Sequence, residues 1–337
     1  MTKKIEDCGL ASLQSSAGVG VIVGTVDSVN ITPLEEELQH KFTQKKYQNM
    51  QLASDYYVLG SMDSKFASRI DRVSQCGTML KFGINEKGEH KLIHANFCRD
   101  LMCPQCNWRR SLRMFGEVSA CMDILESKYT FLFATFTIKN CDAANLKNTC
   151  STLQKSLTKM LRVKLLKSVI KGFFWALEVT YNPIDKTYHP HLHVIFVVNP
   201  SYFTSHNVYI SQKRWVELWK NALGVDYTPI VYISKLHGDT KKAVAEVAKY
   251  SVKGSDYLGQ PMVLKAMFDA LSHRKKCAFG GVFKDARKQI GLDSDEVSDE
   301  LIHTDPLAVR DDVFVAFVSC SWNGNGYSTM TYGYDWE

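Results

Sequence analysis

Apolar and polar positions in the central part of the chain alternate between strand-like and helix-like segments. Three runs rich in aromatic and β-branched residues predict strands: YTFLFATFTI (129–138), GFFWALEVTY (172–181) and HPHLHVIFVV (189–198). Apolar residues recur at helical spacing in 145–170, 211–223 and 241–253. This alternation predicts an α+β domain whose helices cover one face of a sheet.

The two ends of the chain carry weaker patterns. Apolar spacing predicts a helix over 34–46, and DDVFVAFVSCSW (311–322) alternates like a strand. The final NGNGYSTMTYGYDWE (323–337) is expected to be loose. The patterns together divide the chain into four regions: 1–70, 71–128, 129–260 and 261–337.

Composition narrows the class of protein. With 337 residues, 45% of them hydrophobic and 23% charged, the chain can bury a sizeable core and form more than one domain. Its apolar runs are too short to cross a bilayer, so we expect a protein without membrane contact. Ten cysteines without a secretion signal predict thiols or metal ligands in a cytoplasmic protein, rather than a disulfide framework.

Charge is unevenly distributed. Residues 293–337 hold ten acidic residues against Arg310 alone, a net charge of −9. Because the formal net charge of the whole chain is +6, the first 292 residues carry +15. A basic body favours a phosphate-rich partner, because lysines and arginines that meet phosphates release condensed counterions.

Histidines alternate with apolar residues on the third predicted strand. His191 and His193 share one face because strand side chains alternate, and two imidazoles on one face form half of a divalent-metal site. A hairpin through 182–186 would place Glu178 opposite them, and a buried carboxylate there calls for a cation. We therefore predict a metal site made of Glu178, His191 and His193.

The same strand also fits another class of chemistry. His189, His191 and His193 match the HxHxH pattern of histidine-triad nucleotide hydrolases, which use a histidine nucleophile. Pro190 within the strand and the length of the chain count against this alternative.

The helix predicted over 241–253 carries groups suited to phosphoryl transfer. Glu246 and Tyr250 are four residues apart and share a face, with Lys249 and Lys253 close by. A phenol can attack a phosphodiester, lysines can offset phosphate charge, and a carboxylate can activate water or a hydroxyl. Taken alone, the segment fits an ordinary surface helix equally well. Tyr257 is a rival nucleophile beyond Gly254.

A cysteine cluster precedes a basic run. Cys98, Cys103 and Cys106 have the spacing of a closed tetrahedral zinc site, with Cys76 as the fourth ligand and His94 or His90 as substitutes. Directly after the cluster, an aromatic residue is followed by guanidiniums, as expected of a DNA-facing surface. These residues are Trp108, Arg109, Arg110 and Arg113.

With these motifs in place, the chain resembles the Rep proteins of rolling-circle plasmids of Gram-positive bacteria, within the HUH endonuclease superfamily. The likeness spans about 76–288. It depends on NFCR with CPQCNWRRS (96–111), FATFT (133–137), EVTY with YHPHLH (178–193) and EVAKY (246–250), in the order typical of the family.

The resemblance implies a five-stranded antiparallel HUH sheet with flanking helices, a zinc-binding segment and additional terminal regions. It implies that Tyr250 attacks one phosphodiester at the double-strand origin and leaves a 5′-phosphotyrosyl link. Glu246 would activate water at termination, and Glu178, His191 and His193 would hold Mg²⁺ or Mn²⁺. The implied partners are plasmid DNA, a host helicase and a DNA polymerase, with a second copy of the chain as a further expectation.

The four regions take roles from this resemblance. Residues 71–128 become a zinc-binding, DNA-contacting segment and 129–260 the nicking domain, while 1–70 and the acidic end have no assigned role. The DNA contacts are expected from Arg109, Arg110, Arg113, Lys249 and Lys253. A second hypothesis keeps the zinc segment and the basic body in a non-catalytic DNA-binding repressor.

Overall fold

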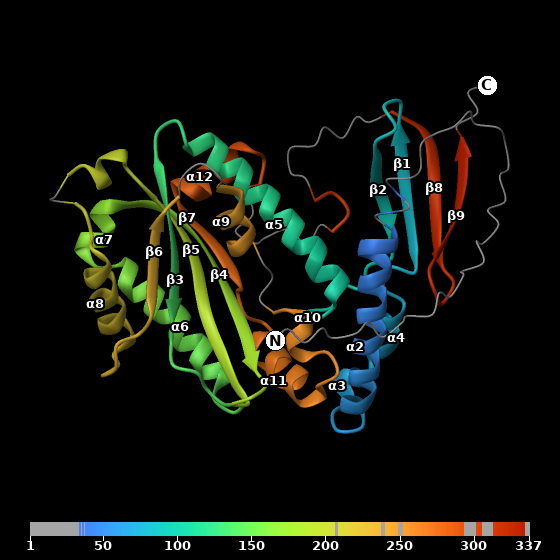
Figure 1. Cartoon of the computed structure of the whole chain (residues 1–337), viewed down its shortest axis with the longest axis horizontal. Helices are drawn as coiled ribbons and strands as arrows, with labels where there is room; N and C mark the ends of the chain where they lie inside the picture. The colour runs from blue at the N-terminus through green and yellow to red at the C-terminus, as the bar shows by residue number, and fades with distance from the viewer. Residues whose placement is uncertain are drawn as a thin grey trace, which may run out of the picture.

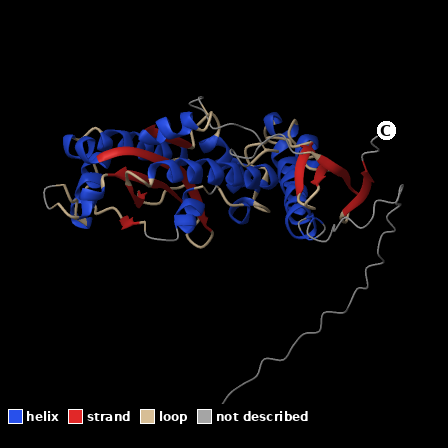
Figure 2. Cartoon of the chain, turned by 90° about the horizontal axis from the view of Figure 1, so that it is seen from above, coloured by secondary structure: helices blue, strands red, loops and turns tan. Residues whose placement is uncertain are grey.

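Two antiparallel sheets lie side by side along the long axis of the molecule (Figure 1). The structure is a computed structural model, which describes residues 34, 36, 38–205, 208–236, 240–248, 252–292, 301–304 and 313–333. Figure 2 shows the helices gathered around the larger sheet and along its border with the smaller one.

The larger sheet has five strands, all paired antiparallel, which confirms the predicted α+β class. From edge to edge they are β6 (Val231–Lys235), β3 (Thr130–Thr137), β5 (Thr187–Val198), β4 (Ile170–Asn182) and β7 (Cys277–Gly281). The three central strands are those predicted from sequence, and the predicted hairpin between β4 and β5 is confirmed, with Asn182 paired to Thr187.

Helices cover both faces of this sheet, so the prediction of a single covered face is wrong. The structure has α6 (Leu146–Leu161), α7 (Lys164–Val169), α8 (Gln212–Leu223) and α11 (Pro261–Leu271) packed in the core of one face. The core of the other face is built with α5 (Pro104–Leu125), α9 (Thr240–Val247) and α12 (Val282–Gln289) (Figure 1). The reason lies in β5, where Ile195 and Val197 point to one face while Val194 and Phe196 point to the other.

The smaller sheet joins distant parts of the chain. Its order is β2 (His90–Ala95), β1 (Met79–Asn85), β8 (Phe314–Trp322) and β9 (Tyr327–Gly333). The strand predicted over 311–322 is confirmed as β8, but the expectation that 323–337 is loose is wrong for β9. The Asn-Gly-rich turn at 323–326 folds the chain back, and β9 gains its order by pairing with β8 along its whole length.

The N-terminal helices bridge the two sheets. The predicted helix over 34–46 is present as the π-helical turn η1 (Leu38–Thr43), which leads into the longer α2 (Gln44–Gly60). The short helices are α3 (Ser64–Ala67), α4 (Ile70–Ser74), η2 (Pro200–Phe203) and α10 (Gly254–Tyr257). Within the described part of the chain, no helix combines the length and apolar character needed to cross a bilayer.

Local signals fix where the central helices begin and end. Ser211 accepts a hydrogen bond from the Arg214 amide at the start of α8, and Gly224 ends that helix in the left-handed conformation with φ 71°. The long predicted helix 145–170 is divided into α6 and α7, because Val163 is extended with ψ 133°.

Candidate functional site

The hairpin β4–β5 brings a carboxylate and two imidazoles together. Glu178 pairs with His191 across the hairpin, as predicted. Glu178 Oε2 lies 3.3 Å from Nε2 of His191 and 3.0 Å from Nε2 of His193, and the two Nε2 atoms are 3.1 Å apart. All three side chains are at least nine-tenths buried. They can therefore offer one oxygen and two nitrogens to a single cation.

The spacing of these three atoms fits a hard divalent ion. Ligands that stand about 2.1 Å from Mg²⁺ at right angles to one another are about 3.0 Å apart. The described residues leave the rest of such a coordination sphere to water or substrate oxygens, which is the usual condition of a catalytic site.

Neighbouring groups orient both imidazoles. Thr135 Oγ1, paired to His193 through the register of β3 and β5, lies 3.2 Å from its Nδ1. The Nδ1 of His191 lies 3.1 Å from the carbonyl oxygen of His189. These contacts direct both Nε2 atoms towards Glu178, as outer-shell partners of metal-bound histidines do.

A lysine borders the metal ligands. Lys253 Nζ lies 3.2 Å from Oε1 of Glu178, and the Glu178 charge raises the pKa of Lys253. Burial alone would raise the pKa of Glu178, but hydrogen bonds with His191 and His193 and the charge of Lys253 outweigh it and hold that pKa well below the ordinary range. Glu178 is thus held in the ionised form that binds cations.

Among the described residues, the helix predicted over 241–253 is present only as α9 (Thr240–Val247), which lies beside this cluster, while Val252 and Lys253 lie outside any helix. Glu246 Oε1 is 3.7 Å from Nε2 of His193, and its side chain is 39% exposed. Tyr250 and Lys249 lie outside the described residues. The structure therefore brings Glu246 to the metal ligands, while the roles of Tyr250 and Lys249 stay predictions.

The rival tyrosine has a structural partner. The Tyr257 side chain is fully buried, and its hydroxyl donates a hydrogen bond to the carbonyl oxygen of Met102. A phosphodiester therefore has no access to this phenol in the folded chain.

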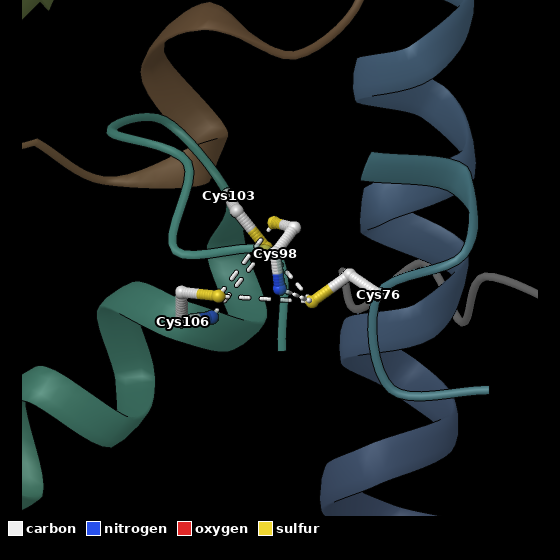
Figure 3. Close-up of side chains that lie close together, drawn as sticks. All are labelled: Cys76, Cys98, Cys103 and Cys106. Carbon is white, nitrogen blue, oxygen red and sulfur yellow. Dashed lines mark hydrogen bonds between the residues drawn. The ribbon is translucent and has the colours of Figure 1, made fainter. Parts of the chain in front are cut away.

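Four thiols converge at the start of α5 (Figure 3). Cys76 Sγ is 3.6 Å from Sγ of both Cys103 and Cys106, and Cys98 Sγ is 3.7 Å from Sγ of Cys106. Zinc–sulfur bonds of about 2.3 Å in a tetrahedron place the sulfurs about 3.8 Å apart, so the donor set fits zinc. The fourth side chain in the group is Cys76, and neither His94 nor His90 belongs to it.

Backbone amides support the thiol cluster. The Cys98 amide donates to Cys76 Sγ at 3.3 Å, and the Cys106 amide donates to Cys103 Sγ at 3.5 Å. The second contact caps the N-terminus of α5. Hydrogen bonds from the neighbouring thiols lower the pKa of Cys106 far below its usual value, which favours thiolate at this position.

The arginines predicted to face DNA are held inside the chain. Arg109 Nε and Nη2 each donate at 2.7 Å, to the carbonyls of Leu301 and Ile302, and Arg113 donates to His303 at 2.8 Å. Both arginines are only 5–6% exposed. Arg110 is less enclosed and binds the carbonyls of Arg99 and Asp100. Their contact with DNA stays a prediction, and for Arg109 and Arg113 it would require these bonds to open.

Sequence reasoning missed Thr135 and the pairing of Lys253 with Glu178. The sequence predicts that Lys253 contacts DNA and offsets phosphate charge, but not that it pairs with Glu178. Thr135 could have been found, because it belongs to the motif FATFT and shares a sheet face with His193 once β3 is placed beside β5.

Comparisons with known proteins agree on one family. A family model described as "Replication protein" matches residues 89–329. The chain is 34% identical over 268 residues to "Protein rep" of Streptococcus pneumoniae serotype 2 (strain D39 / NCTC 7466), covering 77% of this chain and 82% of that protein. It is 30% identical over 305 residues to "Protein rep" of Lentilactobacillus hilgardii, covering 85% and 93%. No solved structure matches the chain.

Proposed function

Because this chain belongs to the replication protein family, we propose that it initiates plasmid replication by cutting one DNA strand at the double-strand origin. The observation that carries the proposal is the cluster of Glu178, His191 and His193 next to Glu246 on α9. In the sequence, Tyr250 follows Glu246 by one helical turn.

Strand cleavage would be a transesterification. The Tyr250 phenol oxygen forms a bond to phosphorus, the bond from phosphorus to the 3′ oxygen breaks, and that oxygen takes up a proton. One DNA end is left as a 5′-phosphotyrosyl ester and the other as a free 3′-hydroxyl that primes synthesis. At termination, Glu246 accepts a proton from the attacking water or hydroxyl, whose oxygen bonds to phosphorus while the bond from phosphorus to the Tyr250 oxygen breaks and that oxygen takes up a proton.

Glu178, His191 and His193 would hold Mg²⁺ or Mn²⁺, which supplies Lewis-acid stabilisation of charge on the scissile phosphate. Thr135 keeps His193 in the orientation that aims Nε2 at the ligand cluster. Lys253, half exposed beside Glu178, is placed to offset charge on an incoming phosphate.

Cys76, Cys98, Cys103 and Cys106 would hold a structural zinc ion. Such an ion would tie the loop before α5 to the segment after α4 and fix the first turn of α5. Plasmid DNA, a host helicase and a DNA polymerase are the partners we propose, and self-association into a homodimer is compatible with this role.

The test uses supercoiled plasmid that carries the cognate origin, with Mn²⁺ or Mg²⁺. We expect nicked circles with protein attached, no reaction in the presence of a chelator, and no attached protein with Tyr250→Phe. Tyr57→Phe is the matched control, since this tyrosine is 74% exposed on α2, outside the predicted site. Binding of origin DNA without any nicking by the native chain would favour the repressor hypothesis. Cleavage of small nucleotides without added metal would favour the histidine-triad alternative.

A further inference from the structure

We infer that the outer surface of α6 and α7 binds the backbone of duplex DNA, on the side of the large sheet opposite the metal ligands. The inference rests on the proposed function, since it gives the initiator a second DNA contact. It begins with charge: residues 143–177 contain seven lysines or arginines and no acidic residue.

The fold turns these charges outward. Leu153, Leu157 and Met160 on α6 are fully or almost fully buried in the core beneath the sheet, whereas Lys155 and Lys159 are exposed. Arg162, which follows α6, is exposed as well. These exposed basic residues therefore line the outer side of the helix, which we call the basic strip, while the buried apolar residues pack the helix against the core.

A second segment adds charge to the same strip. Arg274, in the loop between α11 and β7, donates hydrogen bonds to Gln154 Oε1 and to the carbonyl of Lys147, both at 2.8 Å. Gln154 in turn donates to the carbonyl of Lys275 at 2.6 Å, and the Lys275 side chain is exposed. These hydrogen bonds hold a basic loop against α6, which has no acidic residue. They do so although the like charges of the loop and the helix repel each other.

The strip contains a shallow, open hollow of about 380 Å³ lined by Lys155, Thr158, Lys159 and Arg162. Lys159 Nζ lies 3.3 Å from the carbonyl of Asn221 on α8, which fixes one wall of the hollow. Three cationic groups and one hydroxyl around a hollow of this size suit a phosphodiester group, which accepts several charge-assisted hydrogen bonds.

The composition of the strip favours duplex backbone over single-stranded DNA. α6 and α7 contain no aromatic residue, so this surface offers no ring on which unpaired bases could stack. Lysine and arginine contacts to phosphates position a duplex without reading its sequence. From Lys147 to Arg162 the strip runs about 22 Å along the helix, which is the length of about six or seven base pairs.

The two faces of the large sheet would then contact different parts of the DNA. The metal ligands share a sheet face with α5, α9 and α12, whereas α6 and α7 lie on the other face. Duplex held on the basic strip would keep the origin on the protein while an unpaired stretch enters the metal site. We therefore expect the basic strip to affect the affinity for duplex DNA and not the rate of cutting.

The experiment compares the native chain with the triple variant Lys155→Gln, Lys159→Gln, Arg162→Gln. The matched control is Lys87→Gln, Lys128→Gln, Lys186→Gln, which removes the same charge from exposed sites elsewhere. Binding of origin duplex is measured by fluorescence anisotropy over a salt series, and cutting is measured on a single-stranded oligonucleotide spanning the nick. Equal thermal unfolding of the variants serves as the folding control.

The strip variant should lose about one unit of salt slope for each phosphate contact removed, about three in all, and bind duplex at least about tenfold more weakly at moderate salt. Its rate on the oligonucleotide should stay within about twofold of the native rate. An unchanged salt slope, or an equal loss in the control variant, would overturn the inference. Failure of the native chain to cut the oligonucleotide would instead count against the proposed function.

Discussion

His193 Nε2 lies 3.0 Å from Oε2 of Glu178, although the two residues are 15 positions apart in the chain. The contact exists because the turn after Asn182 sets the register of β4 and β5, which places Glu178 directly opposite His191 and diagonal to His193. A slip of one residue in this hairpin would turn the imidazoles to the other face, so the metal site depends on the register.

His193→Ala should strongly weaken cation binding. The substitution removes one of three ligands, so we expect Mn²⁺ affinity, measured by isothermal titration calorimetry, to fall at least about 100-fold, more than the loss usual for an outer-shell partner. His189→Ala is the control, because this side chain contacts Asn140 at 2.7 Å and is outside the ligand set. Loss of cutting in His189→Ala with unchanged Mn²⁺ affinity would point to a histidine-triad mechanism.

Thr135→Val tests the orientation of His193. Valine keeps the shape of threonine but removes the oxygen that lies 3.2 Å from Nδ1, so Mn²⁺ affinity should fall about 10- to 100-fold while the fold is retained. Thr130→Val, at the other end of the same strand, should leave Mn²⁺ affinity unchanged. Equal affinities for both variants would show that Thr135 does not position the imidazole.

The hairpin and its metal ligands could be predicted because their signals are local. The turn residues after Asn182 and the period of two along β5 suffice to place Glu178 opposite the histidines. β9 could not be predicted in this way. Its seven residues, YSTMTYG, lack an apolar run and follow a turn rich in asparagine and glycine, and its order comes from β8, which itself pairs with β1 about 230 to 240 positions earlier in the chain.

The arginine run shows the same limit. Three guanidiniums near one helix end suggest a DNA surface, since arginine is usually exposed. The carbonyl groups that bury Arg109 and Arg113 belong to residues about 190 positions later, and nothing local in the sequence identifies them. Likewise, short strands such as β6 and β7 gain their order from longer neighbours rather than from their own composition.

Glu246→Gln should separate the first cut from termination. If Glu246 activates water or a hydroxyl, the amide variant forms the covalent protein–DNA link at a rate within a few-fold of the native one. Resolution of that link should slow by about 10²- to 10⁴-fold, the usual contribution of a general base. The measurement is quenched-flow analysis on oligonucleotides, with Glu217→Gln on α8 as control. Equal slowing of both steps would contradict the assigned role.

Cys103→Ser should remove the bound zinc and lower the melting temperature. We expect native mass spectrometry to find one zinc ion per native chain and none in the variant. The Tm should fall about 2–4 °C for each kcal/mol by which the free energy of unfolding decreases. Cys150→Ser changes another buried thiol, outside the cluster, and should keep the zinc. A native chain without zinc would refute the assignment.

Asp55 should make stability depend on pH. Burial raises the pKa of Asp55, while hydrogen bonds from the Gly259 amide and Gln51 oppose this effect. Because the folded pKa lies above the unfolded one, the stabilising contribution is fully present below about pH 3.9 and is lost as pH rises through the folded pKa. Urea unfolding between pH 4 and 7 should therefore show that the native chain loses stability relative to Asp55→Asn as pH rises.

The central claim is that Tyr250, which follows α9 in the chain, becomes joined to DNA with the help of Glu178, His191 and His193. Mass-spectrometric mapping of the adduct with a single-stranded origin oligonucleotide tests this most directly. The account predicts a nucleotide attached through its 5′-phosphate to the peptide that contains Tyr250, formed only with a divalent cation. Attachment at another residue, or cutting by the native chain with no covalent adduct at any time, would contradict it.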